Sequence, residues 1–177
     1  DGVHRIVLTL EDLDKPVIAA INGAAMGAGM DMAIMCDLRV CSDKAKLAES
    51  YIMMGLVPGD GGAYFMPRLT GVSKGLELLL TGDVIDPDEA LRLGIVNRVV
   101  PHENLMEETM KLAAKIAAKP PLAVRMMKRA VYQGQTSTLR AHLDYISSQI
   151  SLLSETQDHV EAAKSFLEKR RPQFIGK

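Results

Sequence analysis

Tryptophan is absent from this sequence of 177 residues, and aromatic residues make up only 4% of it, whereas methionine occurs 11 times. A core without large rings must be packed mainly by Ala, Leu, Ile, Val and the adaptable side chain of Met. An excess of positive charge is also absent, since 21 Lys and Arg face 22 Asp and Glu and the formal net charge is −1. This balance argues against a general nucleic-acid-binding protein. With 47% hydrophobic and 24% charged residues, the composition is that of a globular protein and excludes disorder of the whole chain.

Cysteines and long apolar runs are scarce as well. Cys36 and Cys41 form no Cys-x-x-Cys or Cys/His pattern of a zinc site, so we expect two buried thiols in a reducing compartment. The longest stretch without charge, residues 16–30, contains Asn22 and three glycines and is shorter than the ~20 apolar residues of a membrane span. The chain starts at Asp1 without Met or signal-peptide features. We therefore expect the natural protein to begin further upstream and to reside in the cytoplasm, or in the mitochondrial matrix of a eukaryote.

The first hundred residues alternate between helical and strand-like patterns. We expect helices over 3–13, 30–36, 63–69 and 73–80, and strands over 17–21, 38–42, 46–48 and 95–100. Residues 53–62 are too rich in Gly and Pro for regular structure and predict a loop. Asp86 and Pro87 begin a further helix that ends at Gly94, with Glu89 placed to close a capping box. This order is typical of an α/β layer architecture.

Beyond Pro101 the pattern is helical to the end of the chain. Ser154 to Gln157 offers a second capping box for a last helix. Such apolar helices need a partner surface, either the α/β core or a neighbouring subunit. We therefore predict two regions, an α/β core over 1–101 and a helical oligomerisation region over 102–177.

Small residues precede the predicted buried helix, in the segment from Asn22 to Gly29. Unpaired N–H groups and the helix dipole at such a position favour an oxyanion, although the same residues also allow close packing of the helix on a strand. Asp31 follows Ala28 by three residues, so its carboxylate is expected near anything held there. It is a candidate general acid or base, the alternative being an acid that only complements the helix dipole.

Five motifs in this order resemble the enoyl-CoA hydratase/isomerase (crotonase) superfamily. They are Lys15 to Asp37 (KPVIAAINGAAMGAGMDMAIMCD), Gly55 to Gly62 (GLVPGDGG), Leu80 to Asp83 (LTGD), Glu89 to Pro101 (EALRLGIVNRVVP) and Glu168 to Phe174 (EKRRPQF). The resemblance covers nearly the whole chain but only the later two thirds of a typical member. It implies a crotonase-like spiral of ββα units with a C-terminal helical region that forms trimers, often stacked as hexamers.

The resemblance also implies a coenzyme A thioester as substrate and no further cofactor. In the family two backbone N–H groups polarise the thioester carbonyl, and one of them matches Ala28. Ala keeps this N–H where the family usually has Gly. The second donor belongs to a segment that precedes this chain, and losing one such donor typically reduces the rate by ~10²–10³. The expected substrate-binding residues are Ala24, Met26, Gly27, Ala28, Gly29, Pro58 and Gly59.

The catalytic glutamates of the hydratases are both replaced. Asp31 occupies the position of the first glutamate, and Tyr51 occupies the position of the second. Glu49 is two residues from the second position, and two residues along a strand keep the same face but move a group ~6–7 Å, so we do not expect Glu49 to take its place. Tyr51 is a candidate hydrogen-bond or proton donor, or else a wall residue. Asp60 lies within one position of a catalytic Asp of some branches, or else caps a helix.

We therefore predict an acyl-CoA-binding enzyme of the hydratase/isomerase class, with Asp31, Tyr51 and Asp60 as catalytic residues. The missing second glutamate leaves two alternatives, an acyl-CoA hydrolase or C–C lyase of the same superfamily, and a non-catalytic acyl-CoA-binding paralogue. The four histidines lie in separate contexts and predict neither a Ser/His/Asp triad nor a metal site. Expected partners are the acyl-CoA and further copies of the chain, in a trimer or hexamer, with no nucleic acid and no membrane.

Overall fold

The computed structural model describes residues 2–177, which form two compact units. The first unit runs to Leu13 and resumes from Val17 to Lys111. The second consists of Asp14–Pro16 and Leu112–Lys177.

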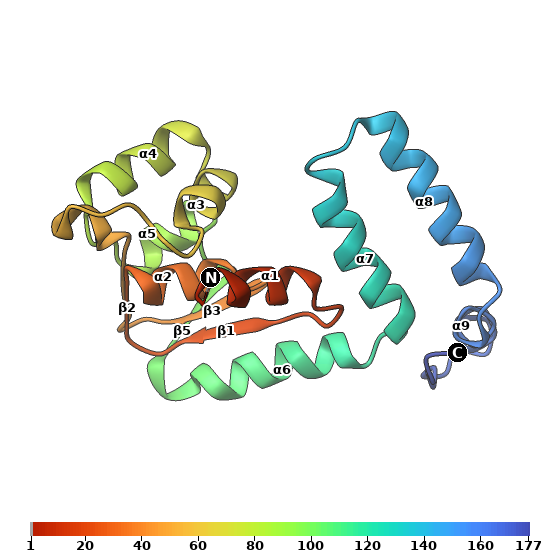
Figure 1. The fold of residues 1–177 in the computed structure, drawn as a ribbon. Helices are drawn as coiled ribbons and strands as arrows, with labels where there is room; N and C mark the ends of the chain where they lie inside the picture. Colours follow the sequence, from red (N-terminus) through yellow and green to blue (C-terminus); the bar gives the residue numbers. More distant parts are fainter. Residues whose placement is uncertain (1) are drawn as a thin grey trace. The chain divides into compact units, whose positions relative to one another are not determined.

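The first unit holds all the strands that the structure describes. Its elements are α1 (His4–Asp12), β1 (Ile18–Ile21), β2 (Ala24–Met26), α2 (Ala28–Ile34), β3 (Leu38–Ser42), β4 (Lys46–Ala48), the 3-10 helix η1 (Ser50–Met54), α3 (Gly62–Thr70), α4 (Val72–Thr81), α5 (Pro87–Arg92), β5 (Arg98–Val100), the 3-10 helix η2 (His102–Asn104) and the start of α6 (Leu105–Ala117). Strands β1, β3 and β5 form a parallel sheet in that order (Figure 1). Strands β2 and β4 form a second, two-stranded parallel sheet. The α/β architecture is confirmed.

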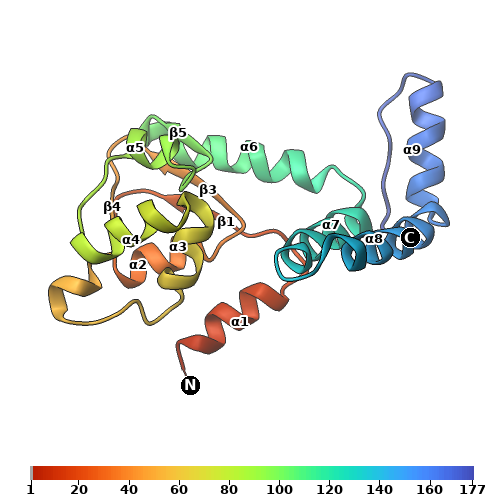
Figure 2. The same ribbon diagram turned by 90° about the horizontal axis from the view of Figure 1, so that it is seen from above.

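The core of this unit is aliphatic with methionine, as the composition predicts. Met30 of α2 and Met66 of α3 are almost fully buried together with Leu47 and Ile95. Helix α3 packs against both α2 and α4, and Figure 2 shows α3 and α4 side by side. Because α2 is wedged between this helical layer and the strands, its first turn is held at a fixed place.

Most of the predicted elements are present, with shifts at their ends. The helix predicted over 30–36 begins two residues earlier, at Ala28, because Gly27 adopts φ 51° and turns the chain into it. The strand predicted over 95–100 begins only at Arg98, since the N–H groups of Ile95 and Val96 both bond to the carbonyl of Ala90. Strand β2 lies within the segment interpreted as a turn before a helix.

The two capping predictions are partly wrong. Asp86 caps α5 by accepting from the N–H of Glu89 at 2.8 Å, as expected. However, the Glu89 carboxylate pairs with Arg92 instead of turning back to close a box. The last helix is capped by Thr156, which accepts from the N–H of His159, and not by Ser154.

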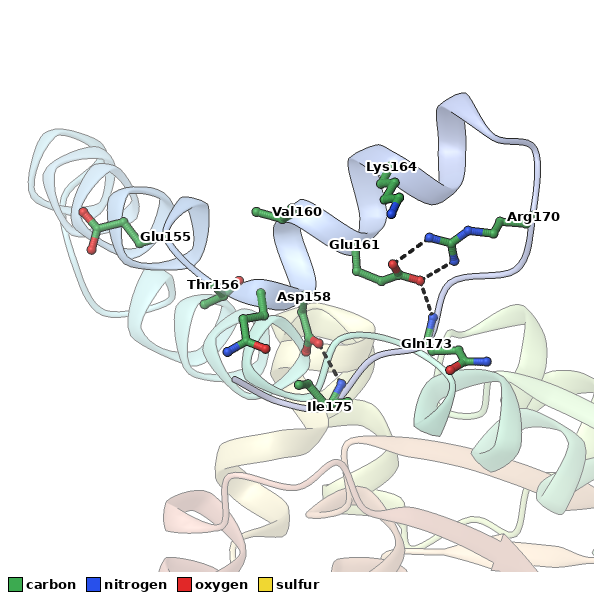
Figure 3. Close-up of a pocket in the computed structure, with 10 residues that line it drawn as sticks. Glu155, Thr156, Asp158, Val160, Glu161, Lys164, Arg170, Gln173 and Ile175 are labelled. Atoms are coloured by element: carbon green, nitrogen blue, oxygen red, sulfur yellow. Dashed lines mark hydrogen bonds and ion pairs between the residues drawn. The ribbon is translucent and has the colours of Figure 1, made fainter.

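The second unit is helical throughout. It contains the end of α6, then α7 (Pro121–Gly134), α8 (Leu139–Ser154) and α9 (Gln157–Leu167). Asp158, buried in α9, accepts a hydrogen bond from the N–H of Ile175 at 2.7 Å (Figure 3). It also accepts from the N–H of Gly176 at 2.9 Å, and the two bonds attach the C-terminal tail to the helix. None of the helices described in residues 2–177 is long and apolar enough to span a membrane.

Candidate active site

Asp31 sits in the first turn of α2 and has no exposed surface. The turn that precedes it depends on Gly27, whose φ of 51° is disfavoured for residues with a side chain. The N–H of Asp31 donates to the carbonyl of Gly27 at 2.9 Å, and this closes the first turn of the helix. The chain thus places a carboxylate in the interior, directly beneath a helix start whose outermost N–H groups have no acceptor within the helix.

Tyr51 and Asp60, the other two predicted catalytic residues, lie beside Asp31. The N–H of Asp60 donates to Oδ2 of Asp31 at 3.1 Å, and the Tyr51 hydroxyl donates to Oδ2 of Asp60 at 3.3 Å. Asp60 is not a helix cap, because Gly61 occupies that position of α3 and no side-chain bond caps the helix. The three side chains come from α2, η1 and the loop before α3.

Glu49 is a fourth member of this cluster, and the assumption that it continues an extended strand is wrong. Strand β4 ends at Ala48, and Glu49 itself has φ −85° and ψ 71° before η1 begins at Ser50. The spacing of an extended strand therefore does not apply, and the side chain turns inward until only 2% of the residue is exposed. The sequence signal that could have identified Glu49 is an acidic residue directly after a buried strand and beside a Gly-rich loop.

Gly62, the first residue of α3, provides the space for the two carboxyl groups. A Cβ atom at this position would meet both oxygens of Glu49, at 2.8 and 2.9 Å, and would approach Oδ1 of Asp31 even more closely. Three of these carboxyl oxygens, Oδ1 of Asp31 and both of Glu49, are buried without a hydrogen-bond partner among the described residues. Asp31 and Glu49 therefore face each other across the bare α-carbon of Gly62.

This crowding shifts the ionisation of the site. Burial raises the pKa of Asp31, while the Tyr51 hydroxyl and the N–H of Asp60 favour the charged carboxylate and oppose the shift. Burial and the negative charge of Asp31 raise the pKa of Glu49 to about 8. Burial and the neighbouring acids also raise the pKa of Tyr51, so its hydroxyl keeps its proton at neutral pH. The cluster can thus offer a proton donor and a proton acceptor side by side.

The predicted substrate-binding residues surround the start of α2 and the loop before α3. Gly27 is buried, whereas Ala24, Met26, Ala28 and Gly29 are exposed, and in the loop Pro58 is half-buried and Gly59 is exposed. Met53 and Met54, in η1, are 74% and 78% exposed and so do not belong to the core. The exposed N–H groups and side chains of this region are open to a ligand, whereas the carboxyl groups lie beneath them.

A pocket also exists in the second unit, between α9 and the C-terminal tail (Figure 3). Two of its charged side chains, Arg170 and Glu161, pair with each other, and Arg170 also pairs with Glu168. It contains none of the predicted catalytic residues. No group of His, Cys, Asp and Glu within residues 2–177 is arranged to hold a metal ion.

Comparison with known proteins decides the family. Residues 2–177 match the enoyl-CoA hydratase/isomerase family. The chain belongs to this family. A crotonyl-CoA hydratase of Syntrophomonas wolfei is 40% identical over 174 residues, which are 98% of this chain and 67% of that protein. A short-chain-enoyl-CoA hydratase of Clostridioides difficile is 43% identical over 152 residues, 86% of this chain and 97% of that one.

Solved structures of this family share the fold. The crystal structure of an enoyl-CoA hydratase from Bacillus anthracis aligns with a TM-score of 0.96 and 36% identity, over 99% of this chain and 68% of that chain. The chain thus has the crotonase fold. It also spans only about two thirds of most relatives, as with a short-chain-enoyl-CoA hydratase of Clostridium acetobutylicum, of which it covers 64%.

Proposed function

We propose that this protein adds water to the double bond of a 2-enoyl-CoA thioester. The observation that carries the proposal is the buried acid cluster around Asp31, directly beneath the exposed helix start at Ala28. Relatives at 40% and 43% identity that are named crotonyl-CoA and short-chain-enoyl-CoA hydratases support this reaction class. Their names also support a coenzyme A thioester as the substrate, and we propose that the reaction uses no further cofactor.

In the proposed reaction the thioester carbonyl oxygen accepts a hydrogen bond from the N–H of Ala28. Asp31 accepts a proton from water as the water oxygen bonds to the β-carbon, and the electrons of the double bond move to the thioester as an enolate. The same proton, or one relayed through the Tyr51 hydroxyl and Asp60, then passes to the α-carbon and restores the carbonyl. One water is added, and Asp31 returns to its starting state. The predicted residues around the turn and loop, Ala24 to Gly29 with Pro58 and Gly59, hold the substrate.

Mass spectrometry of crotonyl-CoA and a small panel of other acyl-CoA thioesters tests the proposal on the full-length protein. We expect the substrate to gain the mass of one water, and we expect Asp31→Ala to abolish this gain while leaving CoA binding intact. Binding of crotonyl-CoA without any conversion would refute the proposal and favour a carrier. Release of free coenzyme A would instead indicate a hydrolase.

Isomerisation of the double bond is the second candidate, and Tyr51 is the observation that favours it. A double-bond shift needs a group that removes a proton from one carbon and returns it to another, and a second carboxylate at the position of Tyr51 is not required for this. Conversion of a 3-enoyl-CoA to its 2-enoyl isomer, without a change in mass, would identify this activity.

We further propose that the chain assembles into trimers or hexamers through the helical region over 102–177. Large apolar side chains of α8 and α9 are exposed in the single chain, among them Leu139, Ile150, Phe166 and Leu167. Burial of such surface is the usual driving force of obligate assembly. Light scattering should give three or six times the mass of the chain, and a monomer would refute this assembly. The cytoplasm or the mitochondrial matrix remains the proposed compartment.

A further inference from the structure

Asp31 and Glu49 form a buried pair of carboxyl groups, and the proposed reaction does not explain how their charges are compensated. Asp31 has no exposed surface and Glu49 is 2% exposed. Three of their four carboxyl oxygens have no hydrogen-bond partner within residues 2–177. Two ionised carboxylates in such a place would repel each other and would both lack compensation for lost water. A single proton between them removes the repulsion and turns one oxygen into a donor for the other.

We propose that Glu49 carries this proton at neutral pH and donates it in a hydrogen bond to Oδ1 of Asp31. Glu49 is thus a positioning residue for the proposed reaction. Asp31 is the charged partner because its other oxygen, Oδ2, already accepts from the N–H of Asp60. When Glu49 donates to Oδ1, both oxygens of Asp31 accept a hydrogen bond, and the carboxylate keeps one orientation beneath the start of α2.

The groups that face the pair are consistent with this assignment. Tyr51 of η1 and Asp60 of the loop before α3 are the titratable groups on that side, and α3 contributes Gly62, which has no side chain. The Tyr51 hydroxyl is a donor and favours a charged Asp31, whereas the negative charge of Asp31 favours a protonated Glu49. Burial and this charge raise the pKa of Glu49 to about 8, well above that of an exposed glutamate.

A titration of the glutamate carboxyl carbons by NMR tests the shared proton without any substrate. We expect one glutamate of the wild-type protein, identified by its loss in Glu49→Gln, to titrate near 8, and we expect Asp31→Asn to move that midpoint toward the ordinary value. Glu77→Gln is the matched control, because Glu77 is an exposed glutamate paired with Lys74. Titration of every glutamate near its ordinary pKa would overturn the proposal, whether or not the protein hydrates any thioester.

The kinetic arm rests on the proposed function and separates positioning from simple packing. Glu49→Gln keeps an N–H donor for Asp31, so we expect nearly full hydration activity but no loss of rate as the pH rises through about 8. Glu49→Leu leaves Oδ1 of Asp31 buried and unpaired, so we expect kcat to fall roughly 10-fold or more. Equal rates and equal pH profiles for the two variants would overturn the positioning role.

Discussion

Gly62→Ala adds one methyl group at the point where Asp31 and Glu49 meet. Ordinary carbon–oxygen contacts begin near 3.4 Å, and the new Cβ would lie 2.8 and 2.9 Å from the Glu49 oxygens. Glu49 must therefore retreat by about 0.5 Å and Asp31 by more, inside a close-packed interior. We expect the free energy of unfolding to fall by roughly 1–3 kcal/mol, the range for overpacked cores. A displacement of a catalytic group by about 1 Å can reduce the rate by about 100-fold.

Urea unfolding and the hydration rate, measured on the same preparation, test this prediction. Gly23→Ala is the matched control, because a Cβ there meets nothing within 4 Å, and we expect its stability to change by less than about 0.5 kcal/mol. Combining Gly62→Ala with Glu49→Ala removes part of the clash, so the two effects should not add. Wild-type stability and activity of Gly62→Ala would refute the geometry of the acid pair.

Three further predictions concern stability. Asp86→Ala removes the helix cap that accepts from the N–H of Glu89. Thermal or urea unfolding should show that the free energy of unfolding falls by about 1 kcal/mol, and an unchanged value would contradict a stabilising cap. Asp158→Asn weakens the hydrogen bonds to the N–H groups of residues 175 and 176, so these amide hydrogens should exchange faster with solvent. Unchanged protection from exchange would contradict the role of Asp158 in attaching the tail. Because the folded state binds the extra proton of Glu49 up to about pH 8, stability should fall as pH rises from about 4.5 to about 8, by a few kcal/mol at most. Urea unfolding across this pH range should show a smaller fall in the free energy of unfolding for Glu49→Gln than for the wild type. Equal pH dependence in the two proteins would refute a role of the Glu49 proton in stability.

The sequence predicts the parts of the site that depend on local signals. Asp31 follows a Gly-rich turn and opens a buried helix, and a carboxylate in that context stands out without any structure. Tyr51 and Asp60 flank a Gly- and Pro-rich loop, which the chain must fold back because Gly55 and Gly61 take positive φ angles.

Glu49 and β2 could not be predicted in the same way. The direction of the Glu49 side chain depends on where β4 ends, and a one-residue error in that boundary turns it to the other face. Strand β2 is three residues of Ala and Met, with no β-branched residue, and exists because β4 pairs with it. Both features depend on contacts between segments far apart in the sequence.

The end of the C-terminal tail, at residues 175 and 176, is attached to α9 through its backbone. Asp158 binds main-chain N–H groups at 175 and 176, so almost any residue there could be held equally well. Proline is the exception at both positions, since it has no N–H to offer. Position 176 is further restricted, because its φ of 75° favours glycine. At these two positions the attachment therefore tolerates drift in the side chain at 175 and depends on the backbone and on Asp158.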